Sequence, residues 1–157
     1  MAEKSALVQH YVEVDQSVKV EQTHQHTVLA FSDGAHRAIL IPAGVKRACQ
    51  QELRAKGVKP GMIVLRIFAA GILLLLENQM HNIASVTIDT EYEGKEGEIK
   101  GLLLRFIRSW VPAFPSEAIT FRQIGKKSPA HRLAWETHRA EWKPNRVVTL
   151  EELLQYC

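Results

Sequence analysis

The sequence predicts a mixed α/β fold built around a five-stranded sheet. Three strand-like segments open the chain, and two later strands are each followed by a helical segment. The 157 residues are 46% apolar and 24% charged, a composition that is typical of an ordinary soluble domain and excludes a disordered or collagen-like chain. A chain of this length can fold without disulfides or a structural metal ion. We expect one domain over residues 1–157, with its core at about 11–141.

The first three strands follow one another closely. Residues 11–21 alternate between apolar and polar side chains, which predicts a strand with one buried face. Residues 27–32 and 36–41 are also typical of strands, and the Asp33-Gly34 pair between them predicts a hairpin turn. The chain therefore opens with three antiparallel strands.

Helix-forming residues come next. Pro42 ends the third strand, and residues 44–56 carry straight-chain side chains up to Gly57, which predicts a helix. The apolar run at 62–76 could be helix or strand, because its periodicity fits both. We expect it to belong to the core.

The longest apolar stretch, residues 63–76, is interrupted by Arg66. It is shorter than the ~20 residues needed to cross a bilayer, so we expect no membrane partner. A homodimer is a further possibility, because this stretch could contribute to a dimer face.

The second half of the chain alternates strands with helices. Residues 85–92 are β-branched and alternate, which predicts a strand. From Ile99 to Trp110, apolar side chains recur at helical spacing, and residues 118–124 predict a fifth strand.

Capping signals mark the last two helices. Ser128 and Pro129 are typical of an N-cap and a first helical residue, and they open a helix that runs to about Glu141. A C-terminal tail follows, in which Thr149 and Glu152 fit a capping box for a short helix at 149–156.

Cysteine content and the first residues bear on location. Cys49 and Cys157 are the only cysteines, and neither has the spacing of a zinc site, which favours a reducing compartment. The opening residues, MAEKSALVQHYVEV, lack the features of a secretory signal. We expect a cytoplasmic protein.

Charge is divided unevenly along the chain. The net charge is +3, but residues 86–98 carry −4 and residues 100–146 carry +7. An acidic centre followed by a basic flank indicates a metal site beside a surface that binds a polyanion. Solvated charges on two helices and a strand are the alternative.

Two acids and a histidine are the candidate metal ligands from their local positions. In the strand at 85–92, Asp89 and Glu91 share a face about 6.5 to 7 Å apart, and a divalent cation would keep both ionised. His131 falls at the third position of its helix, where the helix dipole favours the neutral imidazole. A polar outer face and a histidine covering the helix end are the structural alternatives.

The order of these segments resembles the ribonuclease H-like superfamily, which includes ribonuclease H, Holliday-junction resolvases, transposases and Argonaute nuclease domains. The resemblance rests on an early Asp-Gln-Ser at 15–17, Thr-Ile-Asp-Thr-Glu-Tyr at 87–92 and Gly-Lys-Lys-Ser-Pro-Ala-His at 125–131. It extends over residues 11–141 and implies that the whole chain is a ribonuclease H-like domain.

The resemblance implies a set of metal ligands. The superfamily's first and fourth strands each carry an Asp, and its C-terminal helix begins with Asp or His, which match Asp15, Asp89 and His131. Its middle acidic ligand is a Glu on the helix before the fourth strand, for which Glu77 and Glu52 are candidates. An imidazole in place of a carboxylate favours manganese over magnesium.

The implied activity is metal-dependent cleavage of nucleic acid, either DNA or RNA. Two Mg²⁺ or Mn²⁺ ions would be held by Asp15, Asp89, His131 and one Glu, with Glu91 as a further ligand or a neighbour of the ligands. Flanking phosphates would be held by four cations, Lys126, Lys127, Arg132 and Arg139.

Other functions are less well supported by the sequence. Neither a serine-hydrolase motif nor a phosphate-binding glycine loop occurs. His24 and His26 could face one ion, although turn residues explain them equally well. The main alternative is a noncatalytic ribonuclease H-like module that binds nucleic acid or protein through its basic final third.

Overall fold

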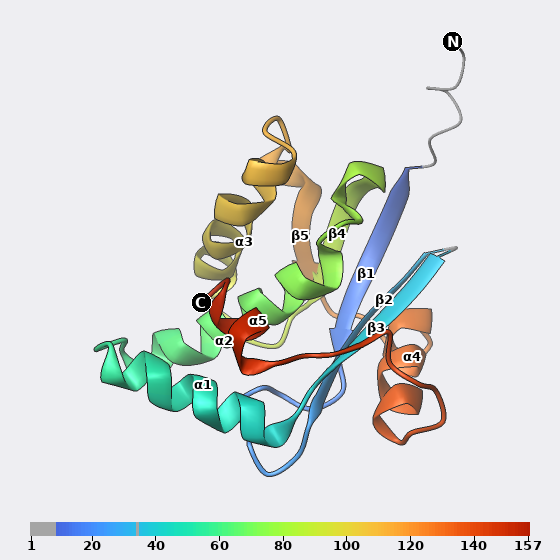
Figure 1. The fold of residues 1–157 in the computed structure, drawn as a ribbon. Coiled ribbons are helices and arrows are strands. Elements are labelled where there is room, and N and C mark those ends of the chain that lie inside the picture. Colours follow the sequence, from blue (N-terminus) through green and yellow to red (C-terminus); the bar gives the residue numbers. More distant parts are fainter. Residues whose placement is uncertain (1–8, 34) are drawn as a thin grey trace.

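A computed structural model describes residues 9–33 and 35–157 (Figure 1). The strands of this part of the chain are β1 (His10–Gln16), β2 (Thr27–Asp33), β3 (Ala35–Ile41), β4 (Ile83–Asp89), β5 (Ile119–Arg122) and β6 (Arg146–Val147). They form one sheet in the order β5-β4-β1-β2-β3-β6. β1, β2 and β3 pair antiparallel, whereas β4 runs parallel to β1, β5 to β4 and β6 to β3.

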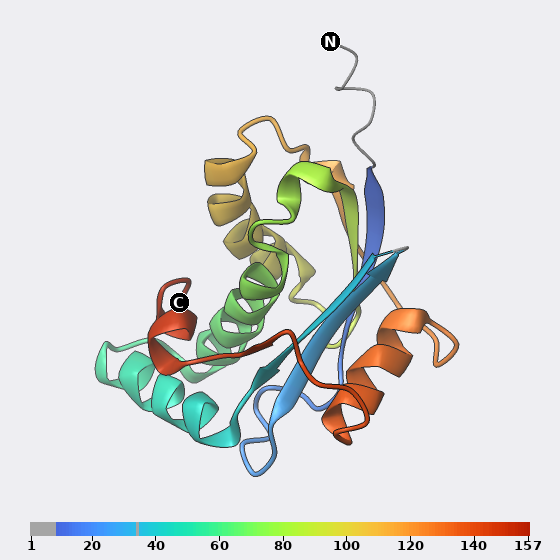
Figure 2. The ribbon, with the colours of Figure 1, turned by 45° about the vertical axis from the view of Figure 1, so that its right-hand side comes forward.

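Helices cover both faces of this sheet. The α-helices are α1 (Ala43–Ala55), α2 (Pro60–Leu76), α3 (Glu96–Trp110), α4 (Pro129–His138) and α5 (Leu150–Leu154). Figure 2 shows α4 on one side of the sheet and α1, α2, α3 and α5 on the opposite side. Leu133 and Ala134 of α4 pack on Val28, Ala30 and Ala38 of the sheet.

The arrangement is a ribonuclease H-like topology, which confirms the predicted fold class. Three antiparallel strands come first, and β4 and β5 then add in parallel, each followed by a helix. Parallel neighbours need a crossover connection, and α3 provides it between β4 and β5.

The sheet has six strands where the sequence predicted five. The sixth, β6, pairs Arg146 with Ile39 and Val147 with Leu40. Two residues are too few to show an alternating pattern, so this strand has no local signal in the sequence. The stretch after residue 141 is consequently joined to the core, where Val148 and Leu153 are buried.

The uncertain apolar run at 62–76 is helical, because it forms nearly all of α2. Twelve of the 17 residues of α2 are buried, including every residue from Ile67 to Leu76. A helix that is apolar all round is expected where it is enclosed by other elements. This burial within a single chain leaves little of the segment for contact with a second copy. Among the described residues, no helix has both the length and the apolar character needed to span a bilayer.

Several predicted elements have different ends in the structure. β1 stops at Gln16 rather than at residue 21, because Ser17 accepts a hydrogen bond from the Val28 N–H and the chain turns away. The strand predicted at 118–124 is the four-residue β5. α4 ends at His138 instead of Glu141, and Ala140 adopts a left-handed φ of 64°.

The predicted helix caps are confirmed. The Ser128 hydroxyl accepts a hydrogen bond from the Ala130 N–H, and Thr149 forms the reciprocal capping box with Glu152. The predicted turn at Asp33-Gly34 includes Gly34, which lies outside the described residues, as do residues 1–8 of the opening segment.

Candidate metal centre

Asp15 lies on the face of β1 that α4 covers, and it is only 3% exposed. One carboxylate oxygen is 2.8 Å from Nδ1 of His131, and the other accepts the Gln16 N–H at 2.8 Å. Burial raises the pKa of Asp15, and the nearby charge of Asp89 adds to this rise, while the hydrogen bond from His131 opposes it. The Asp15 carboxylate is therefore enclosed rather than solvated.

Asp89 reaches the same place from the neighbouring strand. β4 runs parallel to β1 with Val14 opposite Ile88, so Asp15 and Asp89 follow at adjacent positions of one sheet edge. The Asp89 carboxylate accepts the Ile124 N–H at 2.7 Å, which fixes its orientation from the end of β5.

Glu91 completes a group of three acids. Asp15, Asp89 and Glu91 each offer a carboxylate oxygen, and these oxygens lie within 4.8 Å of one another. Burial raises the pKa of Glu91 to about 8, and its hydrogen bond to Asp89 and the charges of Asp89 and Asp15 act in the same direction. Carboxylate oxygens are the ligands that hard divalent cations prefer, so this group could hold a metal ion.

Asp89 and Glu91 do not meet in the way the sequence predicted. β4 ends at Asp89, so Glu91 is not on the same strand face two residues along. Beyond the strand, the Thr90 N–H donates to the Arg122 carbonyl oxygen at 3.1 Å, and Lys19 Nζ donates to the Glu91 carbonyl oxygen at 3.2 Å. Lys19 had no local signal in the sequence, because its contact depends on the turn after β1.

His131 lies beside this acidic group and contacts Asp15. It occupies the third position of α4, whose first turn is also attached to β1 by a 2.8 Å hydrogen bond from the Ser128 hydroxyl to Glu13. His131 Nδ1 is directed at Asp15. The histidine is thus placed to orient Asp15, and its predicted role as a direct metal ligand stays a prediction.

Glu77 is not brought to this site. It follows α2, where it pairs with Arg146 at 2.8 Å and accepts a short hydrogen bond from the Tyr156 hydroxyl at 2.5 Å. Glu77 precedes β4, whereas Asp89 is the last residue of that strand. Because seven strand residues span roughly 20 Å, Glu77 and Asp89 belong to opposite ends of β4. The other candidate, Glu52, is exposed on α1 and is not part of the acidic group.

Cationic side chains line the cavity of the acids and the cavity next to it. A cavity of about 550 Å³ is lined by all three acids together with Lys126, His131 and Trp135, among others. An adjoining cavity of about 470 Å³ is lined by Lys126, His131, Arg132, Trp135 and Arg139. Three of the four predicted phosphate-binding cations therefore line cavities at the site, and the fourth, Lys127, is exposed in the turn before α4.

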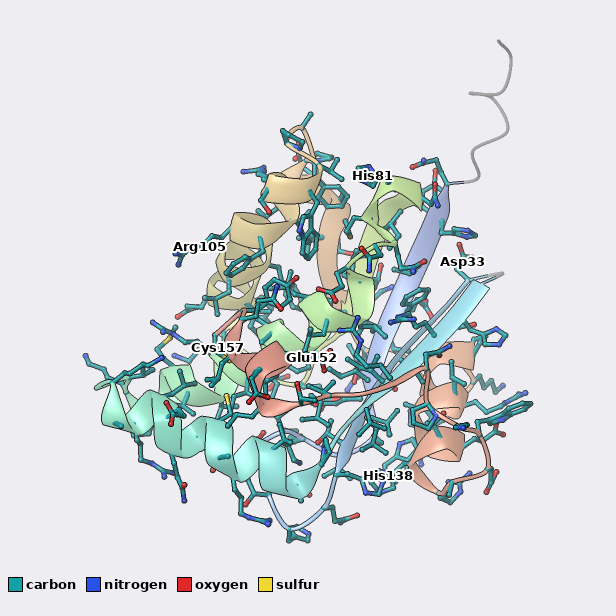
Figure 3. The ribbon with its side chains drawn as sticks, in the orientation of Figure 1. Asp33, His81, Arg105, His138, Glu152 and Cys157 are labelled. Carbon is teal, nitrogen blue, oxygen red and sulfur yellow. The ribbon has the colours of Figure 1, made fainter. Side chains whose placement is uncertain are left out.

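His24 and His26 make different contacts in the structure. His24 is hydrogen-bonded to Gln25, whereas His26 stacks on His138 with 4.1 Å between ring centroids. His138 lies near the C-terminal end of α4 (Figure 3), and its Nδ1 is 2.9 Å from the Ser17 hydroxyl. Burial lowers the pKa of His138, and the charge of His26 acts in the same direction. These contacts attach the end of α4 to the β1–β2 connection.

Fold and site together define a class: a chain of ribonuclease H-like topology whose adjacent strands carry an acidic Asp/Asp/Glu group. Comparisons with protein-family models, with curated protein sequences and with solved structures found no match to this chain. The functional argument therefore depends on the geometry of the site itself.

Proposed function

We propose that this protein is a divalent-metal-dependent nuclease that hydrolyses phosphodiester bonds of DNA or RNA. The observation that carries the proposal is the meeting of Asp15, Asp89 and Glu91, whose carboxylate oxygens lie within 4.8 Å of one another in a cavity that Lys126 also lines. Three acids bind a cation, and a lysine beside them binds the phosphate that the cation would also contact.

Each residue has a distinct role in this proposal. Asp15, Asp89 and Glu91 would hold Mg²⁺ or Mn²⁺, which supplies an activated water molecule and stabilises the departing oxygen in phosphodiester hydrolysis. His131 positions Asp15 through its 2.8 Å hydrogen bond. The Ile124 N–H positions Asp89 in the same way.

The test is cleavage of labelled single-stranded, duplex, hybrid and branched substrates with Mn²⁺, with Mg²⁺ and with a chelator. We expect Asp89→Asn to lower the cleavage rate by about 100-fold or more, because it removes one charged ligand. The matched control is Glu93→Gln, which neutralises an exposed acid two residues from Glu91 and leaves the acidic group intact.

Thermal unfolding shows whether the Asp89→Asn variant is folded. Without metal and above about pH 8, where Glu91 is ionised, this variant should melt at a higher temperature than the parent chain, because it relieves repulsion among three close carboxylates. Manganese should raise the melting temperature of the parent chain and of Glu93→Gln, but not that of Asp89→Asn. Metal-independent cleavage, or no cleavage of any substrate by folded protein, would contradict the proposal, and binding without cleavage would favour the noncatalytic alternative.

A further inference from the structure

A third cavity lies on the α4 side of the sheet, beyond the two at the acidic group. Its volume is about 380 Å³, and it lies between α4, the ends of β2 and β3, and the segment after α4. Arg132 lines both this cavity and the neighbouring one, which in turn shares Lys126 and Trp135 with the cavity of the acids. The three cavities are therefore neighbours that follow one another across α4, and we call this row of cavities the track.

The far cavity has one side chain on which a nucleobase can stack and one that can donate a hydrogen bond to it. Trp142 is 59% exposed, and its indole N–H donates to Glu136 at 2.8 Å, which holds the ring in place while leaving it accessible. The Asn145 side-chain oxygen accepts the Ala38 N–H at 2.8 Å. Within the described residues, no hydrogen bond involves the amino group of Asn145, so this group remains available to an acceptor on a base.

Positive charge continues along the whole track. Residues 125–143 contain five Lys or Arg side chains and two acids. One acid, Glu141, is paired with Arg139, and the other, Glu136, is bound to Trp142. Lys126, Arg132 and Lys143 have no ion pair within the described part of the chain. These three cations are spaced along the track and are available for phosphates.

Trp135 places an aromatic ring near the acids. It is half-buried, its ring centroid is 6.5 Å from that of His131, and it lines both the acid cavity and the middle cavity. Alternating aromatic and cationic side chains are the chemistry that binds unpaired bases and their backbone, because every base has a face on which a ring can stack. In a duplex those faces are stacked against one another.

We infer that this track, the α4 track, binds a single-stranded nucleic acid whose scissile phosphate lies at Asp15, Asp89 and Glu91. This inference rests on the proposed function and names its substrate class. Lys126, Arg132 and Lys143 bind successive phosphates, and one base lies against Trp142 in the far cavity, several nucleotides from the acids.

The experiment measures binding by fluorescence anisotropy in the presence of a chelator, so that no cleavage occurs. The probes are labelled single strands of DNA and of RNA, about ten nucleotides long, and a DNA duplex of the same sequence. We expect single strands to bind more tightly than the duplex. Trp142→Ala should weaken binding about tenfold, because it removes one stacked base, whereas Trp142→Phe should retain most of the affinity.

Two arginine variants distinguish binding at the α4 track from non-specific binding to positive charge elsewhere on the protein. Arg132→Gln should weaken binding about tenfold and reduce the salt dependence by about one phosphate contact. The matched control, Arg105→Gln, removes an exposed arginine from α3 on the opposite side of the sheet and should bind like the parent chain (Figures 2 and 3).

The outcomes distinguish this inference from the proposed function. Parent-like binding by both Trp142→Ala and Arg132→Gln, tighter binding of the duplex, or no binding of any probe overturns the α4 track. If metal-dependent cleavage is nevertheless observed, the nuclease proposal stands. Conversely, tryptophan-dependent binding without cleavage in Mn²⁺ supports the track and contradicts the nuclease.

Discussion

Lys46 is a lysine whose side chain is completely buried. Its Nζ donates to the Gln22 carbonyl oxygen and to the Thr27 hydroxyl, each at 2.8 Å, and so attaches α1 to the β1–β2 connection and to the start of β2. Burial lowers the pKa of Lys46 to about 8, although the charge of Glu21 opposes this effect. The protonated amine therefore makes folding less favourable than a neutral one would.

Lys46 should give the protein a measurable pH dependence. Its folded pKa of about 8 is below its ordinary value of 10.5, so the unfolded chain binds more protons between these values and stability rises with pH across that window. Below about pH 8 the group is protonated in both states and the full penalty is present. We expect a contribution on the order of 2 kcal/mol to the free energy of unfolding.

The measurement is urea unfolding at about pH 7.5 and about pH 10, compared between Lys46→Met and the exposed control Lys56→Met. The control should keep the rise in stability, and Lys46→Met should lose it. Equal pH dependence of the two variants would contradict the assignment.

At the scale of elements, α2 approaches the sheet closely because it carries a glycine at the contact. A Cβ at Gly71 would lie 2.5 Å from Leu29 Cδ1 and 3.1 Å from Ile41 Cδ1. Both neighbours are fully buried, so neither can move without disturbing others.

We predict that Gly71→Val lowers the free energy of unfolding by about 1 to 3 kcal/mol, as overpacking of a core does. The matched control is Gly101→Val on α3, where a Cβ meets no atom within 4 Å, and this change should be within about 0.5 kcal/mol of neutral. Denaturant unfolding of the two variants compares them directly. Similar stability for both would show that α2 does not pack against β2 and β3 as described.

Local signals account for the elements that the sequence predicted well. Ser128 and Pro129 mark the start of α4 because capping acts over a few adjacent residues, and the placement of His131 in its first turn follows from them. The failures are non-local. β6 exists only because Arg146 and Val147 meet β3, and Glu77 is held by Arg146 and Tyr156 from the far end of the chain.

At the scale of the whole molecule, the site depends on which strands become neighbours. Asp15 and Asp89 are far apart in the chain, and only the parallel pairing of β1 with β4 brings them to one edge. Both acids could be predicted from the sequence because the chain resembles a known family. The sequence alone did not predict how the rest of the site is assembled, because this depends on how α4 packs and on the turn after β4 that carries Glu91.

The measurement that tests the central claim most directly is anomalous X-ray diffraction from crystals of the protein soaked in Mn²⁺. We predict an anomalous peak bounded by the carboxylates of Asp15, Asp89 and Glu91, at about 2.2 Å from at least one oxygen of each Asp. Crystals that take up manganese elsewhere, or not at all, while these three carboxylates remain together would contradict the claim that this group is a metal centre.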